Sequence, residues 1–375
     1  MGRRAILAIN LVVLAGLLAA LELVAGYLTS LDGSGWPRLT VLARRLARGP
    51  GEESGSLLAE IRRLRAAGVA AYPAYRHDPQ MHAPDSPWFH THLPGSTVVL
   101  CEADSGVVRF RADDLGFRPT PGARPDRPWR QILVGDSFSE GWCVPDRDTL
   151  AASLQRSHGN TINAGRSGSG PLAQLALLQE LAASRSSRQR IGAGTVVIWQ
   201  LFSGNDAHNL REEKTTRLAT ALSGSGSGQF DAPQRWQPAL RTFLDDLVAD
   251  APVQGPGARR HQPGEHGGGE TLTPARLRGD LALQGQVFGR FIATVRSLGA
   301  QPLVLLLANH PDQRPELMEP WEREIRRLCR SSGVPLVEID LASAGLGLAQ
   351  DGHLNGAGYG LVGQRLGAAI TALGR

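Results

Sequence analysis

The chain is poor in lysine, so almost all of its positive charge comes from arginine. Lys214 is the only lysine among 40 basic residues, so the net charge of +5 and the isoelectric point of about 9.6 depend on arginine. The arginines are spread along the 375 residues, whereas a nucleic-acid site gathers them on one face or stripe. We attribute the charge to compositional bias and expect no nucleic-acid partner.

Cysteine is scarce as well. Cys101, Cys143 and Cys329 form neither a CxxC pair nor the spacing of a metal site, and an odd number excludes a complete disulfide framework. Two interpretations stay open: a Cys101–Cys143 bridge in an oxidising compartment, or three buried free thiols. His90 and His92 lack an accompanying carboxylate or cysteine cluster, so we expect them to be structural or at the surface. We predict no metal and no cofactor.

A long apolar segment opens the chain. Arg3 and Arg4 precede a run that is broken near its outer end by Glu22. The run approaches the roughly 20 residues that cross a bilayer as a helix, and the two arginines orient its N-terminus toward the cytoplasm. A signal peptide cleaved after small residues is the competing interpretation. We predict an uncleaved anchor over residues 1–28, with the rest of the chain outside the cytoplasm.

The remainder divides into an arm and one larger domain. Residues 29–96 predict a membrane-proximal arm, and alternating apolar residues over 97–117 predict a hairpin that opens the domain 97–375. Short apolar runs then alternate with helical patterns, which is typical of a parallel sheet covered on both faces. The predicted strands are 132–134, 161–163, 195–199, 302–307 and 335–339. Five such strands fit a flavodoxin-like three-layer α/β/α sandwich, whose ligand site lies at the carboxyl ends of the strands.

One stretch interrupts this alternation. Residues 207–273 contain two glycine-rich segments of flexible-linker composition on either side of a helical pattern over 238–247. We predict a flexible insertion, which forms either a lid over the site or a surface excursion.

A serine directly follows the first predicted strand of the sheet. Gly135-Asp136-Ser137-Phe138 turns from strand into helix, which places the Ser137 hydroxyl where free N–H groups favour a developing anion. The segment is not a G-x-S-x-G elbow, because Ser139 occupies the last position. For an isolated turn of this kind a helix N-cap is the better explanation, so a catalytic meaning depends on the other motifs.

Three further segments follow later strands and supply what a serine nucleophile needs. Gly168 offers a backbone N–H and Asn205 a side-chain amide, although a turn and a helix cap would also explain them. His353 can accept the proton of Ser137, and Asp351 can hold the useful imidazole tautomer. Together with the Ser137 amide, these groups are the components of acyl transfer through a serine ester.

At these four segments the chain resembles the SGNH (GDSL-type) hydrolase superfamily over roughly residues 97–375. The resemblance implies the flavodoxin-like fold inferred above. It also implies a role for each site residue: Ser137 as nucleophile, His353 as base, Asp351 as orienting acid, and Gly168 and Asn205 as oxyanion donors. Two positions depart from the pattern. Ser203 replaces the usual glycine of the third block, and Asp351 stands two residues before His353 rather than three.

These residues predict a membrane-anchored, extracytoplasmic serine esterase that cleaves carboxylic esters of carbohydrates or lipids. The same groups serve an O-acyltransferase that modifies envelope polysaccharide with a membrane acyl-donor partner, so the motifs leave that alternative open. A non-catalytic carbohydrate-binding SGNH-like protein and an anchored envelope assembly protein are further alternatives. Trp142 and Trp199 either shape an acyl or sugar pocket or pack within the core.

Overall fold

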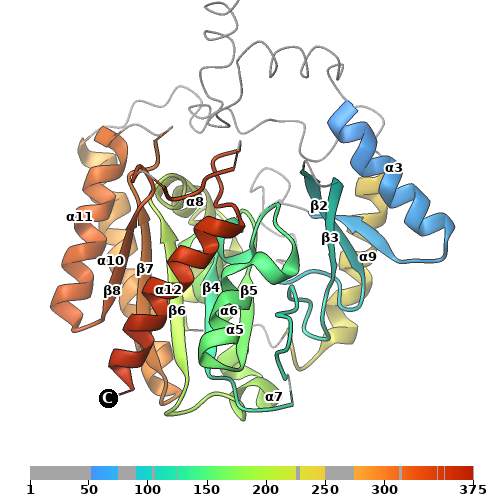
Figure 1. Cartoon of the computed structure of the whole chain (residues 1–375). Helices are drawn as coiled ribbons and strands as arrows, with labels where there is room; N and C mark the ends of the chain where they lie inside the picture. The colour runs from blue at the N-terminus through green and yellow to red at the C-terminus, as the bar shows by residue number, and fades with distance from the viewer. Residues whose placement is uncertain are drawn as a thin grey trace, which may run out of the picture.

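The computed structural model describes most of the chain after residue 51 (Figure 1). The described ranges are 52–74, 90–103, 106–124, 126–224, 229–249, 274–311, 315–343, 345–349 and 351–374. The predicted anchor over residues 1–28 lies outside these ranges. Within them, no helix is both long and apolar enough to span a bilayer.

A five-stranded, wholly parallel sheet forms the centre of the molecule, with the strand order β5-β4-β6-β7-β8. The strands are β4 (Gln131–Gly135), β5 (Thr161–Gly165), β6 (Val196–Phe202), β7 (Gln301–Ala308) and β8 (Leu336–Asp340). The predicted sheet is therefore confirmed, and the strand ends differ from expectation by at most three residues. Since the chain order reverses beside β4, the loops after β4 and β6 open at the switch point where ligands bind in such sheets.

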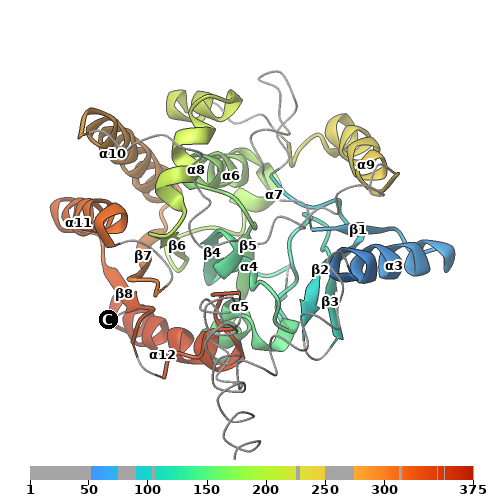
Figure 2. The same cartoon turned by 90° about the horizontal axis from the view of Figure 1, so that it is seen from above.

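Helices cover both faces of the sheet, as Figure 2 shows from above. One face carries α5 (Leu150–His158) and α12 (Gly356–Leu373), and the other carries α6 (Pro171–Ala183), α8 (Asp206–Glu213), α10 (Pro274–Ser297) and α11 (Pro315–Ser332). Successive strand residues supply the two cores in turn: Leu133 joins one cluster, and Ile132 and Val134 join the other. Trp199 is fully buried and stacks on Phe291 with ring centroids 4.0 Å apart, so it packs in the core.

A smaller lobe precedes the sheet in sequence and lies beside it. It contains α3 (Glu52–Ala66), β1 (Ala71–Pro73), β2 (Thr97–Ala103) and β3 (Gly106–Arg111). The hairpin predicted over 97–117 corresponds to the antiparallel pair β2 and β3, and β1 adds to β2 in parallel.

The insertion contributes α9 (Pro233–Ala249) to this lobe. Trp236, Leu240 and Leu244 of α9 form one buried cluster with Tyr72 and Leu93. Helix α9 thus covers the arm, whereas Leu210, Leu218 and Ala221 of the same insertion pack in the core of the larger domain. A lid function for residues 207–273 stays a prediction, because residues 225–228 and 250–273 lie outside the described ranges.

A disulfide joins the lobe to the larger domain. Cys101 of β2 bonds to Cys143, which follows the short helix α4 (Ser137–Glu140), and Cys329 is a buried free thiol. The structure therefore contains the bridge that the sequence left open.

Candidate active site

Ser137 is the first residue of α4, directly beyond the end of β4. Asp136 caps the helix, because its Oδ1 accepts the Phe138 N–H at 2.9 Å. Gly135 lets the helix sit close against the sheet: a Cβ there would lie 2.3 Å from Ser139 Oγ and 2.4 Å from Gln200 Oε1. The turn therefore requires glycine, and it fixes the direction of the Ser137 hydroxyl.

The structure brings Ser137 and His353 together from opposite ends of the domain. Ser137 Oγ lies 2.8 Å from His353 Nε2, which is the distance of a hydrogen bond. Both residues are nearly buried, with exposed fractions of 8% and 5%. His353 stands in the loop between β8 and α12, where Asn355 caps α12 by accepting the N–H groups of Ala357 and Gly358. The loop is therefore anchored immediately after the histidine.

Asp351 contacts His353 twice. Its Oδ1 accepts the His353 backbone N–H at 3.1 Å, and its Oδ2 lies 3.4 Å from the ring Nδ1. Burial alone would raise the pKa of this carboxyl, but the charge and hydrogen bonds of His353, with a bond from Trp142, outweigh it and lower the pKa to about 2. A carboxylate two residues before the histidine therefore reaches the imidazole and stays ionised beside it.

The two predicted oxyanion donors, Gly168 and Asn205, lie in the loops after β5 and β6, the strands on either side of β4. Gly168 has a φ of +78° in a turn closed by a 3.0 Å hydrogen bond from Ser169 N–H to the Arg166 carbonyl. Asn205 precedes α8, but its side chain makes no capping bond and instead donates to the Asp136 carboxylate, next to Ser137. The Asn205 amide group is therefore directed toward the nucleophile turn.

Two buried carboxyls lie beneath the nucleophile. Asp136 and Asp206 are both fully buried, and Asp206 Oδ2 accepts the Phe202 N–H at 2.7 Å. Burial raises the pKa of each carboxyl, and the charge of Asp136 raises the pKa of Asp206 further. Each group therefore disfavours ionisation of the other.

Aromatic rings enclose the histidine. The ring centroid of Phe138 lies 4.8 Å from that of His353, and that of Trp142 lies 6.0 Å away. The indole N–H of Trp142 also donates to Asp351, so this tryptophan belongs to the site, and it packs at the same time against the core of the smaller lobe. Its neighbour Cys143 carries the disulfide.

Sequence reasoning missed several polar residues at the site. His310, in the loop after β7, donates from Nε2 to the Gly352 carbonyl at 2.9 Å, and no motif marks it. Glu140 and Arg166 lie within the motif segments but carry no signal of their own. His92 is buried against Glu140, so of the two expected roles, structural or at the surface, it has the structural one. Among the described residues, no group of histidine, cysteine, aspartate and glutamate side chains is arranged to hold a metal ion.

Comparison with known proteins gives one family match. The model of the GDSL-like lipase/acylhydrolase family matches residues 133–361, which is more than half of the chain. No curated protein matches the chain.

The solved structures to which the chain is similar are remote in sequence. The psychrotrophic esterase EstA from Pseudoalteromonas sp. is 11% identical over 65% of this chain and 98% of its own, with a TM-score of 0.36. A family two carbohydrate esterase from Clostridium thermocellum is 14% identical over 67% of both chains, with a TM-score of 0.37. An extracellular lipase from Streptomyces rimosus is 14% identical over 62% of this chain and 97% of its own, with a TM-score of 0.31.

Proposed function

The chain belongs to the GDSL-like lipase/acylhydrolase family and is a hydrolase of ester bonds, and from this premise we propose that it works as an extracytoplasmic serine esterase with Ser137 as its nucleophile. The observation that carries the proposal is the 2.8 Å contact between Ser137 Oγ and His353 Nε2. A hydroxyl is a weak nucleophile until a base accepts its proton, and this contact supplies the base.

In the first half of the proposed cycle, Ser137 Oγ attacks the ester carbonyl carbon while its proton passes to His353 Nε2. Asp351 stabilises the imidazolium that forms, because its low pKa keeps it negatively charged. The backbone N–H groups of Ser137 and Gly168 and the Asn205 amide stabilise the oxyanion of the tetrahedral intermediate.

In the second half, the intermediate collapses and His353 returns the proton to the departing alcohol. The acyl group stays on Ser137 as an ester. Water then attacks this ester with His353 as the base, which releases the carboxylic acid and restores the Ser137 hydroxyl. The same steps with a sugar hydroxyl in place of water would give the transferase alternative.

The proposed substrate class follows from the proposed location. Disulfides persist in oxidising compartments, so the Cys101–Cys143 bridge supports a site outside the cytoplasm, as does the apolar segment that follows Arg3 and Arg4. A cell-envelope location favours O-acylated carbohydrates or lipid esters as substrates. The proposed anchor would keep the enzyme at the membrane.

The first test measures hydrolysis of p-nitrophenyl acetate by the full chain in detergent. Ser137→Ala and His353→Ala should abolish turnover. Ser157→Ala and His208→Ala delete the same side chains outside the site and should leave turnover at the parent level. After an acid quench, mass spectrometry should find one acetyl group on Ser137. Adding acceptor sugars then distinguishes transfer from hydrolysis.

A parent protein as inactive as Ser137→Ala towards a panel of acyl esters would overturn the esterase proposal. It would favour the non-catalytic carbohydrate-binding alternative. Turnover that survives in Ser137→Ala would reject Ser137 as the nucleophile.

A further inference from the structure

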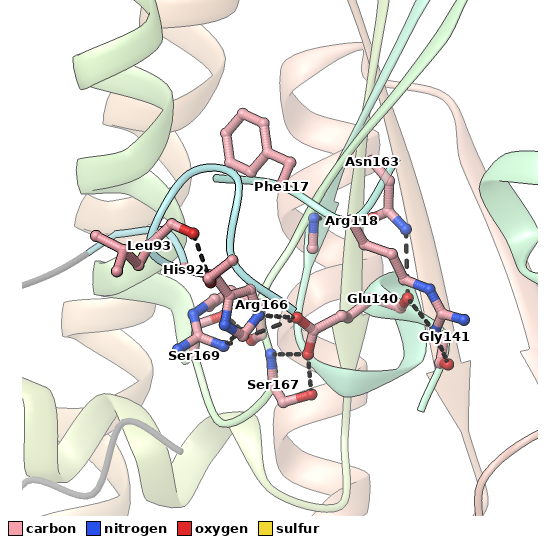
Figure 3. A network of polar contacts seen from close by, with 12 residues as sticks. His92, Leu93, Phe117, Arg118, Glu140, Gly141, Asn163, Arg166, Ser167 and Ser169 are labelled. Carbon is pink, nitrogen blue, oxygen red and sulfur yellow. Dashed lines mark hydrogen bonds and ion pairs between the residues drawn. The ribbon is translucent and has the colours of Figure 1, made fainter. Parts of the chain in front are cut away.

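Glu140 is a buried carboxylate that the proposed cycle does not use. It is the last residue of α4, three positions after Ser137, and its side chain is fully buried between the loops shown in Figure 3. Burying a carboxylate is costly unless charged or hydrogen-bonding partners offset the lost hydration. The partners of Glu140 therefore indicate what this residue does.

One carboxylate oxygen holds the turn that carries Gly168. Oε2 accepts the Ser167 backbone N–H at 3.0 Å and also the Ser167 hydroxyl. On the other side of the turn, Ser169 Oγ donates to the Gly135 carbonyl at 3.0 Å. The Gly168 amide thus lies between two residues that are both tied to the nucleophile segment.

The other oxygen meets two residues that can hold it in place. Oε1 lies 2.6 Å from His92 Nε2 and 3.7 Å from Arg166 Nη1. His92 Nε2 also lies 2.8 Å from Arg166 Nη1, so this nitrogen either donates to Glu140 or accepts from Arg166. Burial, then the charge of Arg166, lowers the pKa of His92 to about 4. At neutral pH, Arg166 is therefore the cation that balances Glu140.

Neighbouring side chains also donate hydrogen bonds to the backbone carbonyl of Glu140. Arg118, whose side chain is fully buried, donates to the Glu140 and Gly141 carbonyls at the end of α4. Asn163 Nδ2 donates to the same Glu140 carbonyl at 3.3 Å. His92 and Arg118 both precede residue 133, where the family match begins. The segment that leads into the domain therefore completes the surroundings of Glu140.

We propose that Glu140 is a positioning residue that fixes the Ser167–Gly168 turn, so that the Gly168 N–H is presented to the oxyanion. The oxyanion part of this inference rests on the proposed function. Glu140 touches neither the substrate nor Ser137 Oγ in this scheme and acts through the loop.

Two substitutions separate the reach of the carboxylate from its charge. Glu140→Asp keeps the charge that balances Arg166 but withdraws the carboxylate by one methylene from Ser167. Glu140→Gln keeps the reach and an acceptor oxygen but loses the charge. If positioning is the role, Glu140→Asp should lower kcat by about 10–100-fold with KM within about twofold of the parent, because loss of a whole oxyanion donor costs about 10²–10³-fold. Glu140→Gln should retain more of kcat than Glu140→Asp.

Asp280→Asn is the matched control, because it neutralises another buried carboxylate, which pairs with Arg211 and Lys214. It should change thermal stability without changing kcat. A kcat for Glu140→Asp within twofold of the parent would overturn the inference, as would a kcat for Glu140→Gln below that of Glu140→Asp.

Amide hydrogen exchange tests the positioning without turnover. The peptide covering residues 163–170 should exchange faster in Glu140→Asp than in the parent or in Asp280→Asn, because the bond from Ser167 N–H is weakened. Unchanged exchange would overturn the inference even if the parent is an active esterase. Faster exchange in a protein without esterase activity would support the structural role and reject only the proposed function.

Discussion

The carboxylate of Asp351 holds His353 at two points, the backbone N–H at 3.1 Å and the ring Nδ1 at 3.4 Å. One side chain therefore sets both the local loop conformation and the orientation of the imidazole. A separation of two residues between Asp351 and His353 is sufficient, because both residues lie in the same short loop. The carboxylate therefore contacts the imidazole without having to reach across the site.

Replacement of this carboxylate should slow the reaction with little effect on the fold. In Asp351→Asn the backbone bond can survive, but the imidazolium loses its counter-charge. We expect kcat/KM for p-nitrophenyl acetate to fall by about 10⁴-fold, the order of loss seen when the orienting acid of a serine triad is removed. The side chain is 38% exposed, so the melting temperature should change little. A loss below fivefold would show that Asp351 is not the orienting acid.

Stability should depend on pH through Glu213. This carboxylate accepts the N–H groups of Gly170 and Leu172 at 2.6 and 2.9 Å, at the start of α6, where Gly170 provides no side-chain cap. Burial raises its pKa to about 8 in spite of these donors. Between its ordinary pKa of about 4.5 and about 8, the folded protein holds a proton that the unfolded chain has released, so stability falls as pH rises through that window.

Glu213→Gln keeps an acceptor for these N–H groups but cannot ionise. Its melting temperature should therefore fall less steeply than that of the parent between pH 5 and pH 8. Burial and the charge of Asp136 also raise the pKa of Asp206, so part of the slope should remain. Calorimetry at four pH values across the window measures both slopes. Equal slopes would assign the titration to Asp206 or another buried acid instead of Glu213.

Loss of the disulfide should weaken both the fold and the site. Cys101 and Cys143 are 42 residues apart, and closing a loop of that length stabilises a protein by about 4 kcal/mol in the chain-entropy description. The double variant Cys101→Ser/Cys143→Ser should lose free energy of unfolding of that order in urea. Its kcat should also fall, because Trp142, which donates to Asp351, directly precedes the bridge.

A reductant provides the control for the disulfide prediction. It should destabilise the parent. It should leave the double variant unchanged, because the cysteine that remains there, Cys329, is a buried free thiol. Equal urea midpoints for the parent and the double variant would contradict the prediction.

The sequence indicated the sheet well, because parallel strands buried on both faces are continuous apolar runs that few other elements resemble. The ends of these strands then located Ser137, Gly168, Asn205 and His353 at one edge. The contact between Glu140 and His92 could not be predicted in this way, because it joins a motif residue to a segment with no periodic pattern. His310 was equally hidden, since its contact is to a backbone carbonyl.

The packing of the insertion could not be predicted from the sequence either. Glycine-rich composition on either side of residues 238–247 indicates flexibility, and the pattern between the two segments predicts a helix. Nothing local revealed that Trp236 and Leu240 would pack on Tyr72, because the partner lies more than 150 residues earlier in the chain. Contacts of such separation depend on the topology and not on the local pattern.

The packing of α9 on β1 has a consequence for how the protein is made. Tyr72 and Leu93 leave the ribosome long before the helix that covers them, and β4, β5 and β6 are synthesised in between. Since the chain emerges from its N-terminus during synthesis, the first lobe to appear cannot be completed until α9 has followed β6, although it is still completed before β7 and β8 finish the sheet. The apolar side chains that α9 covers stay exposed until residue 249 has emerged, and apolar surface exposed in this way is prone to aggregation.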